Sequence, residues 1–197
     1  MKWWNRLFGK KKSDRPDKSP YLPKEKVPKE LEFAEKFTES GGFFIYCENR
    51  KEVLENFTYI LKENRWGKED VLCFDENLAT VFDLPHSKQD QKKTSINVGL
   101  FLCEYLISNT GSILFCHHQT KHLKMNQLPK TLVVYAAGNQ FVSDVSEGMT
   151  KLKNKYERKI PTNIRTINCE DNKQIEGDSF STNTSKSIYL LLQDDLF

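Results

Sequence analysis

The sequence lacks the features that most readily identify a membrane protein or a nucleotide-dependent enzyme. No apolar stretch reaches about 18 residues, so we expect no bilayer-spanning helix. The glycine-rich signatures of dinucleotide binding, of P-loop NTPases and of α/β hydrolases are also absent. Met1 is followed directly by Lys2-Trp3-Trp4, without the apolar segment of a secretory signal, so secretion is not indicated.

Paired cysteine motifs are missing as well. The chain has five cysteines, an odd number, and none forms a Cys-x-x-Cys pair. A disulfide framework and an iron–sulfur cluster are therefore not expected, and the sequence indicates no cofactor. Four of the five lie in apolar surroundings, which favours buried, reduced thiols in the cytoplasm: Cys47, Cys73, Cys103 and Cys116.

Charge is distributed unevenly along the chain. Residues 1–30 hold ten Lys and Arg residues against four acidic ones, a net charge of +6, whereas the whole chain carries +3, so residues 31–197 are slightly acidic. An acidic body argues against nucleic-acid binding. Four prolines within residues 1–30 oppose regular structure. We therefore expect a flexible basic arm over 1–30 and one folded domain over 31–197.

The beginning of this arm is amphipathic. One helical face would carry Trp3, Trp4, Leu7 and Phe8, with basic residues around it. Such a segment would contact an anionic membrane surface or a protein partner. It is only two turns long, and so short a helix is marginal in water. A disordered or self-docking arm is therefore the alternative interpretation.

The hydrophobic pattern predicts an α/β fold. Residues 43–47 read as a strand, Asn49 and Glu52 as a capping box, and the following apolar spacing as a helix to about Asn64. With a second strand at 71–74, this makes a β-α-β unit with parallel strands. A short helical turn is expected after Asp75.

The remaining segments complete an open mixed, largely parallel sheet flanked by helices. Residues 96–115 predict two antiparallel strands, ending at 105–107 and starting at 112–114, around a Gly-containing turn. Further strands are expected at 131–135 and 164–168, and an apolar strand at 187–192 should lie mid-sheet. A second amphipathic helix is indicated by the spacing of Phe141, Val145, Met149, Leu152 and Tyr156.

Two segments are candidates for chemistry. His117, His118 and His122 are closely spaced, but the residues after the strand read as an exposed loop, and no acidic residue between 105 and 143 would complete a metal site. We therefore expect solvated histidines and no metal. The turn Ser108–Ser112 offers hydroxyls, an amide and backbone N–H groups for an anion, or is an ordinary hairpin turn.

The same turn carries a family resemblance. The stretch Cys103–Leu114 resembles the signature of the lactate-utilisation (LUD) domain family, in which an apolar strand runs into an Ala-Glu-Thr-Gly-Thr/Ser turn. Leu128-Pro129 before the strand at 132–134, and the closing strand at 188–192, agree in order and spacing. The resemblance implies a fold like that of sugar-phosphate isomerases and CoA transferases. It also implies partners, the iron–sulfur oxidoreductase subunits of lactate utilisation.

The sequence departs from the family in the loops before its last strand. The family's Gly-Pro-Ser-x-Thr-Ala-Asp-Ile-Glu is reduced here to Ile175-Glu176, and Glu170 and Asp171 add negative charge. Like charges near a protein surface repel by several kcal/mol at about 4 Å, so anion binding is disfavoured. The ligand-binding residues implied by the resemblance are Asn109, Thr110, Gly111, Ser112, Glu176, Asn183 and Ser185.

Three functional hypotheses follow. The first is a non-catalytic accessory subunit linked to lactate or another organic acid. The second is an active enzyme on a CoA ester or sugar phosphate, with Glu104 or Glu176 as the base near the turn. The third is an interaction protein recruited to membranes by the arm.

Overall fold

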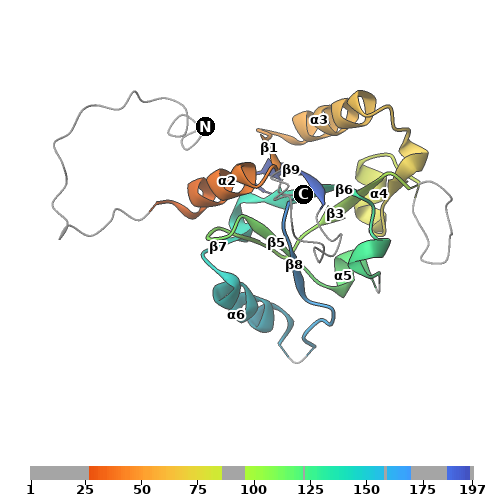
Figure 1. The fold of residues 1–197 in the computed structure, drawn as a ribbon. Coiled ribbons are helices and arrows are strands. Elements are labelled where there is room, and N and C mark those ends of the chain that lie inside the picture. Colours follow the sequence, from red (N-terminus) through yellow and green to blue (C-terminus); the bar gives the residue numbers. More distant parts are fainter. Residues whose placement is uncertain (1–26, 86–95, 122, 158, 170–185, 196–197) are drawn as a thin grey trace, which may run out of the picture.

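The molecule is built in four layers, helices on sheet on sheet on helix (Figure 1). The computed structural model describes residues 27–85, 96–121, 123–157, 159–169 and 186–195. Two apolar layers flank the first sheet, and a third lies under the last helix. The prediction of an α/β fold with a largely parallel sheet flanked by helices is confirmed.

The first sheet is entirely parallel. It has the order β1-β9-β6-β3-β2, formed by β1 (Phe43–Tyr46), β9 (Ser187–Gln193), β6 (Thr131–Ala137), β3 (Val98–Leu102) and β2 (Val71–Leu72). The closing strand β9 lies inside the sheet, as its uninterrupted apolar sequence predicted. The strands β1 and β2 of the β-α-β unit are parallel but form the two edges, because three later strands insert between them.

Helices α3 (Arg50–Glu63) and α4 (Glu76–Val81) cover one face of this sheet (Figure 1). The side chain of Asn49 accepts the N–H of Glu52 at 3.1 Å, and Glu52 accepts the N–H of Glu48 at 2.9 Å. The predicted capping pair is thus present, with Glu52 reaching one residue further back than a standard capping box. Asp75 caps α4 in the same way, through the N–H of Leu78 at 2.8 Å.

The second sheet was not expected from the sequence. It has the order β7-β4-β5-β8, with β7 (Phe141–Val142), β4 (Tyr105–Ile107), β5 (Ser112–Phe115) and β8 (Arg165–Ile167). The hairpin β4–β5 is antiparallel as predicted. The apolar run that leads into the hairpin turn forms two strands, β3 and β4, rather than one. The chain leaves the first sheet after Leu102 and enters the second at Tyr105. Phe141 likewise belongs to β7 and not to the following helix.

Helix α6 (Val145–Tyr156) covers the outer face of the second sheet, on the opposite side of the molecule from α3 (Figure 1). Helix α2 (Lys29–Glu39) packs Phe33 and Phe37 into the apolar layer between the two sheets. The sequence pattern gave no indication of α2, so the folded part begins before the expected strand at Phe43. The short helices are η1 (Lys68–Asp70), α5 (His117–Thr120), η2 (Met125–Gln127) and η3 (Gly138–Gln140).

Candidate functional site

A buried carboxylate lies where the chain crosses from the first sheet to the second. Glu104 follows the end of β3 and precedes β4, and its side chain is fully buried. Its backbone N–H bonds to the carbonyl of Leu114 at 2.9 Å, which places it at the open end of the β4–β5 hairpin. In open α/β sheets, ligands bind beyond the carboxyl ends of the strands, so this position is where a site is expected.

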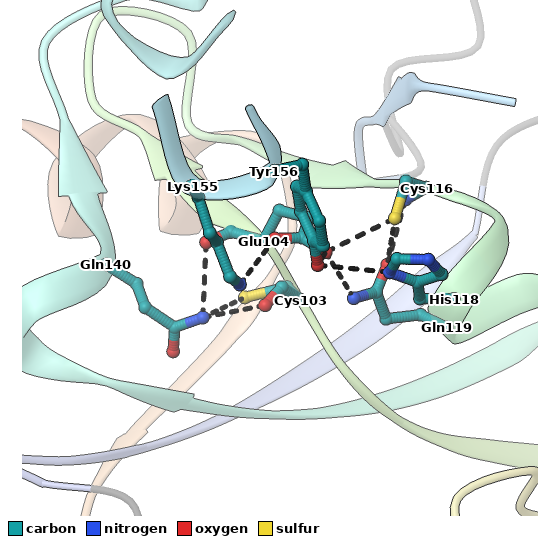
Figure 2. Close-up of polar contacts among 8 residues, drawn as sticks. All are labelled: Cys103, Glu104, Cys116, His118, Gln119, Gln140, Lys155 and Tyr156. Atoms are coloured by element: carbon teal, nitrogen blue, oxygen red, sulfur yellow. Dashed lines mark hydrogen bonds and ion pairs between the residues drawn. The ribbon is translucent and has the colours of Figure 1, made fainter. Parts of the chain in front are cut away.

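Four side chains donate hydrogen bonds to the Glu104 carboxylate (Figure 2). Oε2 accepts from Nζ of Lys155 at 2.9 Å. Oε1 accepts from the Tyr156 hydroxyl at 2.9 Å, from Nε2 of Gln119 at 2.8 Å and from the Cys116 thiol at 3.2 Å. A buried charge is tolerated only when it is paired and hydrogen-bonded, and Glu104 meets both conditions.

The backbone at the crossing is held by one glutamine. Nε2 of Gln140, in η3, donates to the carbonyl oxygens of Cys103 at 2.7 Å and of Glu104 at 3.2 Å (Figure 2). Gln140 itself lies where the chain passes from β6 to β7, the second place at which it leaves the first sheet for the second. The two crossings are therefore joined by direct hydrogen bonds, which fixes the position of Glu104.

The partners of Glu104 come from two elements. Strand β5 ends at Phe115, and the following Cys116 and the short helix α5 bring the thiol and Gln119 to the carboxylate. Helix α6 begins at its cap residue Asp144, which accepts the N–H of Glu147 at 2.8 Å, and its last turn supplies Lys155 and Tyr156. Glu104 thus links the second sheet, α5 and α6.

Glu104 and Lys155 form an ion pair. Burial alone would raise the pKa of Glu104, but the hydrogen bonds from Lys155, Gln119 and Cys116 outweigh it, and the pKa lies below its usual range. Burial acts against the charge of Lys155, yet the bond to Glu104 raises its pKa overall. Both groups are charged at neutral pH.

The neighbouring groups are neutral. Burial, with the adjacent Glu104, raises the pKa of the Cys116 thiol to about 12 and that of Tyr156 to about 12. Burial and the nearby His117 lower the pKa of His118. The Tyr156 hydroxyl already donates to Glu104, so it accepts a hydrogen bond from Nδ1 of His118 at 3.0 Å. The tautomer of His118 with hydrogen on Nδ1 follows from this geometry.

A cavity of about 400 Å³ opens at the carboxyl ends of β6 and β9, and its lining does not include Glu104 or the side chains bonded to it. Pro28 and Leu31 at the start of α2, Phe141 and Leu192 provide its apolar lining. Its charged lining residues are acidic, Glu30 and Asp194. Its volume suits a small organic ligand, but its charges do not suit an anion.

The predicted ligand-binding turn lies at the other end of the hairpin from Glu104. Asn109 and Thr110 are exposed, while Gly111 and Ser112 are buried. A Cβ atom on Gly111 would lie 2.5 Å from the backbone nitrogen of Phe37, so the turn packs directly on α2. The N–H of Asn109 bonds to Ser143, and the hydroxyls of Thr110 and Ser112 bond to each other at 2.6 Å. Binding of a ligand by this turn stays a prediction.

Several predicted residues cannot be placed. They lie outside the described residues. These are Glu170 and Asp171 of the acidic loop, Glu176, Asn183 and Ser185 of the predicted ligand-binding site, Trp3, Trp4, Leu7 and Phe8 of the arm, and His122. Glu104, proposed as a base near the turn, is separated from it by the length of β4.

The histidine segment differs from the expected exposed loop. Residues 117–120 form α5, Thr120 is 1% exposed, and its hydroxyl donates to the carbonyl of Cys116 at 3.2 Å. His117 accepts the N–H of Thr162 at 3.0 Å. The sequence does carry a signal for the cluster, a single charge within the apolar run LFLCEYLI. Its partners Lys155 and Tyr156 lie too far away in the sequence for spacing to reveal them.

All five cysteines are free and buried. Burial was predicted for the four that lie in apolar surroundings, Cys47, Cys73, Cys103 and Cys116. Among the described residues, no helix is long and apolar enough to cross a membrane.

Comparison with known proteins agrees with this architecture. A crystal structure of a DUF162 family protein from Deinococcus radiodurans superimposes with a TM-score of 0.61, at 13% identity, over 84% of this chain and 96% of that chain. At this identity the likeness concerns the fold alone. No curated protein matches the sequence. The model of the LUD domain matches residues 31–191, and the chain therefore belongs to the LUD domain family.

Proposed function

We propose that this chain is a non-catalytic accessory subunit of an assembly that oxidises lactate or a related organic acid. The observation that supports this proposal is that the Glu104 carboxylate already accepts its hydrogen bonds from within the chain. Its carboxylate is fully buried and takes its hydrogen bonds from four side chains of the same chain. The Cys116 thiol beside it is protonated, because its pKa is raised to about 12. A poised base or nucleophile is therefore missing from this cluster.

The cavity at the carboxyl ends of β6 and β9 supports the same proposal. CoA esters and sugar phosphates are anions, and a site for them uses backbone N–H groups or basic side chains. Glu30 and Asp194 in this lining would instead repel them. The link to lactate rests on membership of the LUD domain family, whose name carries that association.

Affinity capture from a native lysate tests the proposal. The tagged full chain is recovered from cells grown on lactate, and the captured fraction is assayed for iron and for lactate-dependent reduction of a dye. We expect the fraction to contain both, whereas the isolated chain reduces no dye. A fraction free of iron and of lactate oxidation would overturn the accessory role.

A ligand screen provides the control. The isolated chain is heated with lactate, a CoA ester or a sugar phosphate, and its melting temperature is compared with that of the protein alone. A ligand at 100 times its Kd stabilises a protein by about 2.7 kcal/mol, so a true substrate would give a clear shift. We expect no shift. A micromolar ligand would replace this proposal with the enzyme hypothesis.

A further inference from the structure

Three potential metal ligands meet beside the ion pair. A carboxylate oxygen of Glu104, Sγ of Cys116 and a ring nitrogen of His118 all lie within 4.8 Å of one another. They come from the crossing after β3, from the end of β5 and from α5 (Figure 2). Glu104 and Cys116 are buried, whereas His118 is exposed. The group is therefore fixed on one side and open to solvent on the other.

We propose that Glu104, Cys116 and His118 form a binding site for a divalent transition metal of the zinc type. Thiolate, imidazole and carboxylate together suit Zn²⁺ and Co²⁺ rather than Mg²⁺ or Ca²⁺, which require oxygen ligands. Three protein ligands leave a fourth position, on the exposed side, for water or a partner's side chain. This inference does not depend on the accessory role.

The spacing of the atoms already approaches that of a metal centre. With Zn–S of about 2.3 Å and Zn–O or Zn–N of about 2.0 Å, ligand atoms of a tetrahedral site lie about 3.3 to 3.6 Å apart. Sγ of Cys116 and Oε1 of Glu104 are 3.2 Å apart, and the thiol hydrogen occupies the space between them. The ring nitrogen of His118 lies within 4.8 Å of the other two atoms, and because His118 is exposed, the proposal requires its ring to rotate into the same range.

Binding is an exchange of the metal ion for a proton. The S–H bond of Cys116 breaks, its electron pair forms the bond from sulfur to the metal, and the proton leaves to solvent. His118 binds through Nε2, the ring nitrogen that carries no hydrogen when Nδ1 donates to Tyr156. No oxidation state changes. Glu104 keeps its second oxygen on Lys155, so the ion pair at 2.9 Å persists beside the metal. Lys155 thus opposes a second positive charge nearby, and sets the affinity of the site lower than its ligands alone would give.

Cobalt titration of the untagged full chain, first dialysed against a chelator, tests this site. Thiolate bound to Co²⁺ gives a charge-transfer band in the near ultraviolet, and we expect that band to appear and to be removed by Zn²⁺. Its absence from the wild-type chain would overturn the proposal.

Two neighbouring histidines provide a matched pair of variants. His118→Ala removes an exposed ligand and leaves the buried cluster in place, so the variant should fold. Replacement of a residue that only hydrogen-bonds to a metal ligand lowers metal affinity by up to about 100-fold. We expect the loss of a ligand itself to lower the affinity for Co²⁺ by more than that. His117→Ala, one residue away, should bind as the wild type does. Equal binding by the two variants would refute the assignment.

Replacement of the lysine gives an independent readout. Lys155→Met removes the positive charge that competes with the metal, so we expect Zn²⁺ to raise the melting temperature of this variant more than that of the wild type. An equal or smaller increase would place the metal elsewhere.

Discussion

At the scale of single residues, the turn between β4 and β5 is defined by one glycine. Gly111 has a φ of +64°, which residues with a side chain rarely adopt. The space for a Cβ atom is occupied by the backbone of α2, at Lys36 and Phe37. The glycine is therefore required both by its own conformation and by the helix packed on it.

Substitution of this glycine is expected to destabilise the protein strongly. Gly111→Ala combines a left-handed conformation, which costs about 1 kcal/mol, with a contact of 2.5 Å to a backbone nitrogen within helix α2. We expect a loss of about 2 to 4 kcal/mol in the free energy of unfolding, measured by urea denaturation. Gly138→Ala is the control, since its Cβ would meet nothing closer than 3.4 Å. Equal losses would contradict this account.

The residue scale also shows how far the sequence reveals the site. Asn49 and Asp75 were recognisable as helix caps, because their partners follow within three residues. The charge of Glu104 in an apolar run indicates a buried ion, but its partner Lys155 is 51 positions away. Tertiary contacts of this kind carry no periodicity, so the sequence singled out Glu104 and His118 separately but did not show that they lie in one cluster.

At the scale of elements, one ion pair connects helix α2, which packs between the two sheets, with helix α6, which covers the second sheet. Nζ of Lys29 in α2 lies 2.8 Å from both carboxylate oxygens of Glu147 in α6. Glu147 also accepts the N–H of Ser143 at 2.7 Å. These hydrogen bonds, that from Lys29 foremost, lower the pKa of Glu147 to about 2 from an ordinary value of 4.5.

Stability should therefore change with pH in a defined direction. Because the pKa of Glu147 is lower in the folded chain, its contribution is complete above about pH 4.5 and is lost as the pH falls toward 2. The pair is partly exposed and screened by solvent, so its worth is about 1 kcal/mol. We expect Glu147→Gln to be less stable than the wild type by about that amount at pH 7, with a difference that shrinks in acid.

Equilibrium unfolding at several pH values measures this difference. Glu55→Gln, which alters an exposed pair with Lys51 in α3, is the control and should stay close to the wild type throughout. A difference for Glu147→Gln that grows on acidification would show that the sign is wrong.

Elements with a strong local pattern were predicted well. Helix α3 has regular apolar spacing, strand β9 has an uninterrupted apolar run, and both appear within a residue or two of the expected positions. Helix α2 was missed, because its sequence is interspersed with charges and follows a proline-rich segment. The division at Cys103 and Glu104 was missed too, since β3 and β4 are both apolar and only their destinations in space differ.

At the scale of the whole molecule, the two sheets share one core. Leu190 of β9 and Leu106 of β4 belong to the same apolar cluster, together with Phe33 of α2. The sheets are further joined by the hydrogen bonds of Gln140. We therefore expect the two sheets to unfold together.

Truncation of a shared core residue tests this cooperativity. Leu190→Ala opens a cavity in a fully buried position and should cost about 2 to 5 kcal/mol. Far- and near-ultraviolet circular dichroism should still report one coincident transition in urea. Leu54→Ala, at a half-buried position on α3, is the control and should cost less. Two separate transitions would show that the sheets are independent.

The placement of β9 between β1 and β6 has a consequence for biosynthesis. On the ribosome, β1 emerges early, but its neighbour in the finished sheet comes after every other strand of the chain. Until then, β1 and β6 each present an unpaired backbone edge in the nascent polypeptide. The sheet cannot be completed until β9 has been synthesised. During that time, the unpaired edges of β1 and β6 are the surfaces that chaperones would protect from aggregation.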